Sequence, residues 1–457
     1  MKFKITLLAL ASAACLTACN DDFFDQVPDD RITIEQVFQR TSYSEKYLAT
    51  VYSYILNEAH RTSPIPWDPC SDDLDVTYDR EDYNSYQINL GNWSASSDYY
   101  EFWSHFYRGI RSATYFIQHI GDNQEMLNDP TRGPLVVEQY KNEARFLRAW
   151  FYYNLLRQYG PCVLLGDEVL PGDLDRDDVK MNLPRSSYDE CVDYICSELE
   201  AAAENLETEQ PLDLFGTPTK GAALALVARL RLQAASPLFN GGTAAHRYFG
   251  DFKRKSDGVH YVSQTYDERK WAVAAAAAKR VMDLGIYRLH TVPADEYTVP
   301  LPANVPSAAF PQGAGGIDPF RSYSEMFTGE TTNVTNPELI WGTTQNVTDQ
   351  QDVVFPLKLG GNSSISIPQR IVDAYRMADG RDIHNASAEY PYEDRPYDQT
   401  CVTTADKQLS KNYRLPGGTY KAYDNREPRF YASIGFSGAL WQMESTTSEE
   451  MRNQIVE

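Results

Sequence analysis

The stretch that decides the fold is VVEQYKNEARFLRAWFYYNLLRQYG, residues 136–160. Apolar side chains recur in it at steps of three or four residues, which places them on one face of an α-helix. These residues are Tyr140, Ala144, Leu147, Phe151, Leu155 and Tyr159. Gly160 and Pro161 come next, and a glycine followed by a proline is a common end of a helix. The stretch therefore predicts one long amphipathic helix.

Four other segments show the same period, and two of them carry faces of alanine that allow close helix packing. They are residues 32–59, 98–120, 218–235 and 267–285. Gly285 is the expected end of the last segment. Amphipathic helices of this kind stack in pairs, so residues 33–290 are predicted to form an almost wholly helical region. The pairs are tetratricopeptide-like, although their spacing is too irregular for a regular array.

The character of the chain changes after residue 290. Pro and Gly cluster in TVPLPANVPSAAFPQGAGG, and short β-like pieces follow at residues 338–343 (ELIWGT) and 352–357 (DVVFPL). Residues 291–457 are therefore predicted to form a loop-rich lobe with a few short strands. At 457 residues the chain exceeds the usual size of a single core. The predicted fold class is mainly α, with helix pairs packed against this irregular lobe.

The N-terminus reads as an export signal. Lys2 and Lys4 precede a short apolar run, and Leu16-Thr17-Ala18 precedes Cys19 with the small residues that a signal peptidase requires. This pattern predicts a lipoprotein signal peptide at residues 1–18 and lipid attachment at Cys19; a plain secretory signal cut nearby is the alternative. Residues 19–32, rich in aspartate, are predicted to form an acidic tether.

Charge excludes one class of partner. The chain has 42 Lys and Arg against 64 Asp and Glu, a net charge of −22. Phosphate backbones and anionic bilayer surfaces repel such a protein. We therefore predict no nucleic-acid partner.

The cysteines after Cys19 suggest no metal site. They are Cys70, Cys162, Cys191, Cys196 and Cys401, and no two of them have CxxC spacing. One or two disulfides or a set of scattered buried thiols would both fit this pattern.

Six further motifs occur in one order along the chain. They are NDDFFDQVP, NEARFLRAWFYYNLLRQYGPCVLL, KGAALALVARLRLQAASPLFNGG, NPELIW, IVDAYRMADG and NREPRFYASIGFSGALW. With the preceding lipobox, this series resembles the SusD/RagB family of outer-membrane nutrient-binding lipoproteins. The most specific parts are Glu143 to Gly160 and the run from Arg426 to Tyr431.

The resemblance implies four tetratricopeptide-like helix pairs and an irregular lobe that holds most of the ligand surface. It implies a lipid-anchored outer-membrane protein, exposed at the cell surface, that binds oligosaccharides. Such proteins deliver their ligand to a SusC-like TonB-dependent transporter, and RagB-like relatives capture peptides instead. The aspartates after Cys19 resemble the family's surface-export tag. Compared with the family, the chain is expected to be shortened at its C-terminus.

Residues 60–87 are the predicted binding stretch, because they interleave aromatic and charged side chains in a Pro-broken loop between helices. Sugars stack their C–H faces on aromatic rings, while polar side chains pair with their hydroxyls. The candidate ligand-binding residues are Trp67, Asp72, Asp73, Tyr78, Arg80 and Tyr83. The starch-binding relative also has stacking aromatics after the segment resembling NPELIW. Here residues 342–366 contain only Phe355, which leaves the ligand class open.

Enzyme motifs are missing. The sequence has no HExxH, GxSxG or GxxxxGK[ST], so the protein is predicted to be no enzyme and to carry no metal or cofactor. Carboxylate pairs such as Asp72 and Asp73 could serve a secreted glycoside hydrolase, but an acidic chain has many such pairs. Calcium at DDLD, residues 72–75, is an alternative to a solvated loop. A scaffold without any ligand is the third class.

Overall fold

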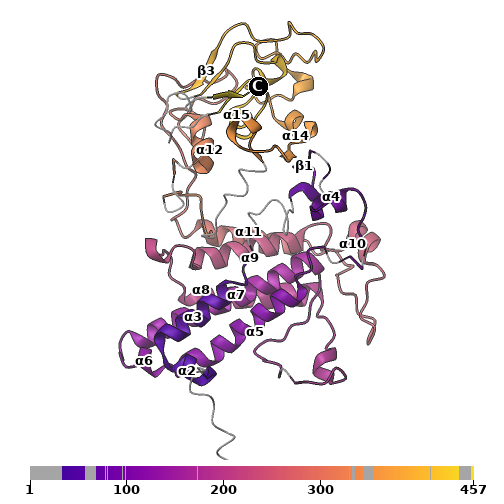
Figure 1. Cartoon of the computed structure of the whole chain (residues 1–457), viewed down its shortest axis with the longest axis vertical. Coiled ribbons are helices and arrows are strands. Elements are labelled where there is room, and N and C mark those ends of the chain that lie inside the picture. Colours follow the sequence, from indigo (N-terminus) through magenta and orange to yellow (C-terminus); the bar gives the residue numbers. More distant parts are fainter. Residues whose placement is uncertain are drawn as a thin grey trace, which may run out of the picture.

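The computed structural model describes residues 33–56, 68–77, 79, 81–94, 96–97, 99–171, 173–328, 330–331, 335–342, 354–411, 413–441 and 454–456. Long helices form a layered array at one end of the molecule, and the later part of the chain forms an irregular lobe at the other end (Figure 1). The predicted mainly α fold class is confirmed.

The helices and strands have the following bounds. The α-helices are α2 (Ile34–Gln39), α3 (Thr41–Tyr52), α4 (Asn84–Asn89), α5 (Trp103–His119), α6 (Gln124–Leu127), α7 (Gly133–Tyr159), α8 (Tyr188–Asn205), α9 (Lys220–Ala235), α10 (Gly242–Phe249), α11 (Arg269–Met282), α12 (Pro319–Thr328), α14 (Gln369–Ala374) and α15 (Pro428–Ser433). The strands are β1 (Asp75–Val76), β2 (Ile365–Ser366), β3 (Lys407–Ser410), β4 (Tyr413–Leu415), β5 (Ala439–Trp441) and β6 (Gln454–Val456). No helix in these ranges is both long and apolar enough to cross a membrane.

The helical array is built from neighbours in the sequence. Helix α5 packs on α7, α7 on α8, α8 on α9 and α9 on α11. The predicted helix at residues 136–160 is α7, and its apolar face supplies fully buried residues such as Phe151 and Leu155. Because each helix buries apolar side chains against the next, one continuous core runs through the array.

Local signals set the ends of these helices. Thr33 and Gln36 form a capping box at α2, and Ser187 and Glu190 form another at α8. Helix α7 ends where Gly160 adopts a φ of 69°, a left-handed value that glycine adopts without strain. The predicted segment 32–59 is two helices, because Arg40 leaves the helical conformation between α2 and α3.

Gly109 is required where α5 crosses α7. A Cβ atom at this position would lie 2.9 Å from the ring of Phe151 and 3.1 Å from the Cβ atom of Tyr54. Both contacts are closer than ordinary van der Waals contact, so a larger residue would push the two helices apart. The glycine therefore fixes the distance between these two helices.

The irregular lobe has its own apolar core, made by Phe320, Val372, Tyr413, Leu415, Phe430, Tyr431, Ile434 and Leu440. Strands β3 and β4 form an antiparallel hairpin beside this core, with an irregularity between Gln408 and Ser410. Strands β5 and β6 form a second antiparallel pair. The described strands thus lie mainly in this lobe, as the loop-rich sequence indicates.

The strand predicted at residues 338–343 is wrong for its described part, residues 338–342, which form turns and irregular backbone. Trp341 packs edge-on against Phe146 and Trp150 of α7, with ring centroids 5.0 and 5.2 Å away. Its indole N–H donates to the carbonyl oxygen of Gly216 at 2.9 Å. The apolar residues of this segment serve the helical core rather than a sheet, a difference that its short pattern does not reveal.

The five described cysteines are free thiols. Cys70 is exposed, and Cys162, Cys191, Cys196 and Cys401 are buried. The sulfur atoms of Cys162 and Cys191 lie 3.8 Å apart, which is van der Waals contact rather than a disulfide bond. Of the two patterns that the sequence allowed, scattered buried thiols fit four of these five cysteines, and Cys70 is the exception.

Candidate ligand-binding site

Residues 68–100 carry the predicted binding loop and lie between the two parts of the molecule. Helix α4 and strand β1 of this segment sit beside the irregular lobe in Figure 1. Strand β1 pairs with β2, so that Asp75 lies opposite Ser366 and Val76 opposite Ile365. Thr77 extends the pairing, since its N–H donates to the carbonyl oxygen of Ser364 at 2.9 Å. A loop from the first part of the chain is thereby fixed to the last.

The other end of the segment is fixed to α7. The carbonyl oxygen of Tyr100 accepts hydrogen bonds from the Gln158 side chain and, at 3.3 Å, from the Tyr159 hydroxyl. The Tyr159 hydroxyl also accepts from the N–H of Phe102 at 2.7 Å. Tyr100 has a φ of 56°, an uncommon value for a residue with a side chain. These contacts hold the strained turn in place, as at many ligand-binding loops.

Of the predicted site residues, the structure places Asp72 and Asp73 at the surface of this segment. An oxygen of Asp72 lies 3.5 Å from the guanidinium of Arg370, and both side chains are largely exposed. An exposed pair of this kind contributes little to stability, so both groups stay available to a ligand. The side chain of Asp75 is engaged, accepting from Asn89 at 3.3 Å and from the N–H of Val76 at 2.8 Å.

Tyr83 is placed differently from the expectation. Only 4% of it is exposed, at the residue before α4, so its ring packs inside the protein and presents no open stacking face. The remaining predicted residues, Trp67, Tyr78 and Arg80, lie outside the described residues, as does Cys19. The contribution of Trp67, Tyr78 and Arg80 to ligand binding stays a prediction, and so does lipid attachment at Cys19.

Trp93 is the aromatic residue that sequence reasoning missed. It is 61% exposed, in the loop after α4. Asn92 beside it donates from its side-chain amide to Gln87 at 2.9 Å. Ser94 lies within hydrogen-bond distance of Ser96 and Ser97. The signal was present in GNWSASS, residues 91–97, where a tryptophan stands among Gly, Asn and Ser with no apolar neighbour pattern to bury it.

The segment presents chemical groups of the kinds that recognise sugars. It offers an indole face for stacking, amide and hydroxyl groups for hydroxyl pairing, and two exposed carboxylates. The described residues contain no group of three or more His, Cys, Asp or Glu side chains arranged for a metal ion.

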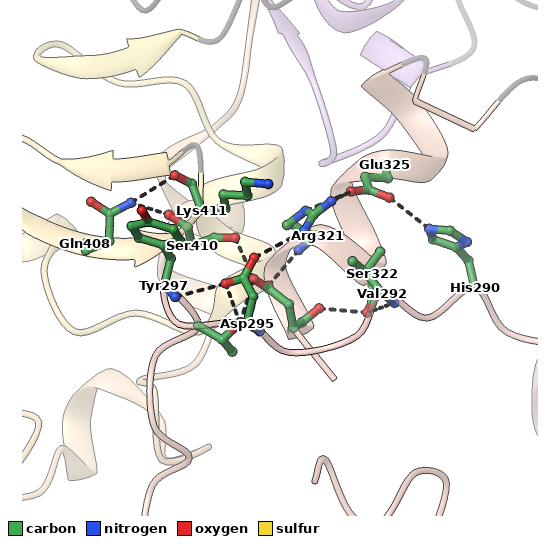
Figure 2. A network of polar contacts seen from close by, with 12 residues as sticks. His290, Val292, Asp295, Tyr297, Arg321, Ser322, Glu325, Gln408, Ser410 and Lys411 are labelled. Carbon is green, nitrogen blue, oxygen red and sulfur yellow. Dashed lines mark hydrogen bonds and ion pairs between the residues drawn. The ribbon is translucent and has the colours of Figure 1, made fainter. Parts of the chain in front are cut away.

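A second polar cluster lies in the irregular lobe and holds α12 in place (Figure 2). Arg321 donates to Glu325 at 2.9 Å, and Glu325 lies 3.3 Å from the ring nitrogen of His290. Asp295 lies 3.6 Å from the same guanidinium. Asp318, fully buried, accepts from Ser410 at 2.6 Å. Each carboxylate here already has a partner, so the cluster joins α12 to residues 290–298 and to β3.

Comparison with known families gives two matches on this chain. Residues 22–232 match a SusD-like family described as starch-binding and associating with the outer membrane, and residues 337–457 match the SusD family. The chain belongs to the SusD/RagB family. The two matches include the long helix α7 and the run from Arg426 to Tyr431 on which the resemblance was based. The family description places this SusD/RagB chain in a group associated with the outer membrane and with glycan binding.

Relatives and solved structures agree with this membership. The SusD/RagB chain is 29% identical over 209 residues to a SusD-like protein of Formosa agariphila, covering 45% of this chain and 38% of that protein. It is 24% identical over 243 residues to a SusD-like protein of Bacteroides ovatus, covering 52% of this chain and 41% of that protein. A crystal structure of a SusD-like protein from Bacteroides fragilis shares the fold, with a TM-score of 0.58 and 22% identity over 91% of this chain.

A second structure from Bacteroides fragilis, of a SusD-like carbohydrate-binding protein, has a TM-score of 0.56 and 18% identity over 90% of this chain. The SusD/RagB chain covers 64% of each of these two crystallised chains and about two fifths of the two relatives. The likeness therefore establishes the family and the fold but not the ligand.

Proposed function

We propose that this chain is a non-catalytic, lipid-anchored surface protein of the outer membrane that binds oligosaccharides. It delivers them to a SusC-like TonB-dependent transporter. The observation that carries the proposal is the exposed Trp93, which stands among amide and hydroxyl groups between two fixed points of the chain, strand β1 on β2 and Tyr100 on α7. The family description and the carbohydrate-binding relative support the same ligand class.

The chain's surface chemistry also favours a neutral ligand. With a net charge of −22 and the exposed acids Asp72 and Asp73 in the predicted binding stretch, an anionic ligand would be repelled. Neutral sugars suit such a surface, since carboxylates accept hydrogen bonds from hydroxyl groups. Neutral oligosaccharides are therefore the first candidates, and peptides are the alternative that the same experiment reveals.

The test is binding of the purified chain to a panel of neutral oligosaccharides and mixed peptides, followed by calorimetry and product analysis. Saturable glycan binding without hydrolysed product supports the proposal. Binding of peptides alone supports the RagB-like alternative, hydrolysed glycan indicates a glycosidase, and no binding to either indicates a scaffold.

Trp93→Ala is expected to weaken glycan binding by roughly tenfold, because losing a stacking ring costs about 1–2 kcal/mol. The melting temperature should stay within about 1–2 °C of the parent value, since the side chain is mostly exposed. Isothermal titration calorimetry measures the first quantity and differential scanning calorimetry the second.

Trp271→Ala is the matched control, because Trp271 is 42% exposed on α11 of the helical array. Its glycan affinity should equal that of the unmodified chain. If Trp93→Ala binds as tightly as Trp271→Ala, the ligand surface lies elsewhere.

Cys19→Ala is expected to remove lipid labelling and to release the protein from the membrane fraction. Cys19 would carry every covalent link between this chain and lipid. Metabolic labelling with an alkyne fatty acid and fractionation in the native host measure both effects. Cys70→Ala is the control, since Cys70 is the exposed cysteine among the described residues. Equal labelling of the two variants would rule out anchoring through Cys19.

A further inference from the structure

Arg370, in the first turn of α14, approaches the predicted binding stretch from the irregular lobe. Its guanidinium lies 3.5 Å from a carboxylate oxygen of Asp72. The Arg370 side chain is 81% exposed and the Asp72 side chain 60%, so solutes reach both groups. Asp72 is a predicted ligand-binding residue, whereas Arg370 lies far from the predicted stretch in the sequence.

The strand pairing accounts for this contact. Strands β1 and β2 are antiparallel, and Asp75 lies opposite Ser366. Residues before Asp75 therefore lie on the same side as residues after Ser366. Asp72 stands three residues before Asp75. Arg370 stands four residues after Ser366, so the pairing brings the two charged side chains together, and Figure 1 shows α14 beside β1.

The turn that carries Asp72 is ordered by its own hydrogen bonds. The N–H of Ser71 donates to the carbonyl oxygen of Asp68 at 3.0 Å. The N–H of Asp73 donates to the hydroxyl oxygen of Ser71 at 3.1 Å. Hydrogen bonds of this local kind define the turn, so the backbone of Asp72 is in place before a ligand arrives.

Helix α14, which carries Arg370, is held by the buried Arg426. The Arg426 guanidinium donates to the carbonyl oxygens of Val372 at 2.5 Å and Tyr375 at 3.0 Å. Carbonyl groups at the end of a helix have no partner within the helix, so these bonds fix that end of α14. Val372 is buried in the apolar core of the lobe. The backbone of Arg370 is therefore fixed on a packed helix.

The two charged groups keep their hydrogen-bonding capacity for a ligand. Hydrogen bonds between a guanidinium and a carboxylate are usually about 2.7–2.9 Å long, and the separation of 3.5 Å here is longer. A carboxylate accepts hydrogen bonds, and a guanidinium only donates them. Side by side they match two neighbouring hydroxyl groups, since one hydroxyl donates to Asp72 while the oxygen of the next accepts from Arg370.

We propose that Arg370 and Asp72 form a clamp for two adjacent hydroxyl groups of one sugar unit. The inference rests on the glycan binding proposed above and narrows the ligand class, with Arg370 as a specificity-determining residue. The clamp favours neutral oligosaccharides whose linkages leave adjacent hydroxyl groups free. In 1,4-linked hexoses and pentoses, O2 and O3 are free in every internal unit. In 1,3-linked chains, the internal units have no such pair.

The test titrates the full chain with neutral hexasaccharides and follows binding by calorimetry. The 1,4-linked probes are maltohexaose, cellohexaose, mannohexaose and xylohexaose, and the 1,3-linked probe is laminarihexaose. One or more of the 1,4-linked probes is expected to bind about fivefold more tightly than laminarihexaose or better, because only the end units of laminarihexaose offer adjacent free hydroxyls. Cellohexaose and laminarihexaose are the most closely matched pair, since both are β-linked chains of glucose.

Two variants test whether the clamp lies at Arg370. Arg370→Gln removes the guanidinium and is expected to weaken binding of the preferred hexasaccharide by about fivefold or more. Arg269→Gln is the matched control, since the Arg269 side chain is 85% exposed on α11 and pairs with Asp267 at 2.8 Å. It should leave binding unchanged. Both side chains are at the surface, so both variants should keep the parent melting temperature.

Equal binding by Arg370→Gln and Arg269→Gln would overturn the clamp, and so would binding of laminarihexaose as tight as that of the 1,4-linked probes. Trp93→Ala, measured with the same probes, separates this inference from the proposed function. Weaker binding by Trp93→Ala with unchanged binding by Arg370→Gln would leave glycan capture standing and remove the clamp. No binding of any hexasaccharide would also remove the clamp, and the wider glycan and peptide panel then decides the proposed function.

Discussion

Replacing Arg148 by methionine is expected to lower the free energy of unfolding by about 3–5 kcal/mol. Arg148 is 1% exposed in the middle of α7. Its guanidinium contacts Glu198 of α8, and donates to Asp167 at 2.7 Å and to the carbonyl oxygen of Gly166 at 3.1 Å. Methionine fills much of the volume but leaves Glu198, only 16% exposed, with the longer contact to Arg145 at 3.9 Å in place of its close pair with Arg148.

Denaturation in urea, followed by circular dichroism, measures this loss. Arg229→Met on α9 is the control, since Arg229 is exposed and its replacement should change the free energy by no more than about 0.5 kcal/mol. A loss below about 1 kcal/mol for Arg148→Met would show that α7 and α8 do not depend on this buried ion pair.

Replacing Phe430 by alanine is expected to cost the irregular lobe about 3–5 kcal/mol, the usual range for a buried phenylalanine. Phe430 is fully buried at the start of α15, within ring contact of Tyr375, Tyr423 and Phe436. The lobe and the helical array have separate apolar cores. The loss should therefore appear as faster hydrogen exchange at residues 369–440, with little change in α7.

Hydrogen exchange followed by mass spectrometry resolves the two regions. Phe327→Ala is the matched control, because Phe327 is largely exposed on α12 of the same lobe. It should leave exchange at residues 369–440 unchanged. Equal loss of protection in α7 and in the lobe for Phe430→Ala would mean that the two cores unfold as one unit, against the boundary proposed near residue 290.

Much of the helical array could be predicted from the sequence, because the three- or four-residue spacing of apolar side chains is visible within each helix segment. The apolar spacing in α7 and the glycine after it sufficed to place both the helix and its end. Trp341 shows where this reasoning fails. Six residues cannot distinguish an apolar strand from a loop that packs on a distant helix, and the partners Phe146 and Trp150 lie far away in the sequence.

The sequence predicted where along the chain the candidate site lies, but it predicted less well which side chains face the solvent there. Asp72 and Asp73 lie at the surface as a polar, Pro-broken loop indicates. Tyr83 is buried, because a tyrosine next to a helix can pack inward as readily as it can face a ligand.

The pairing of β1 with β2 sets the order in which this surface can assemble. The hydroxyl of Thr77 donates to the carbonyl oxygen of Ser363, a residue 286 positions later in the chain, at 2.6 Å. Residues up to 363 must be synthesised before that partner exists, whereas each helix of the array meets its neighbour early. A chain interrupted before residue 363 would therefore lack the β1–β2 pairing that fixes the proposed glycan surface to the irregular lobe.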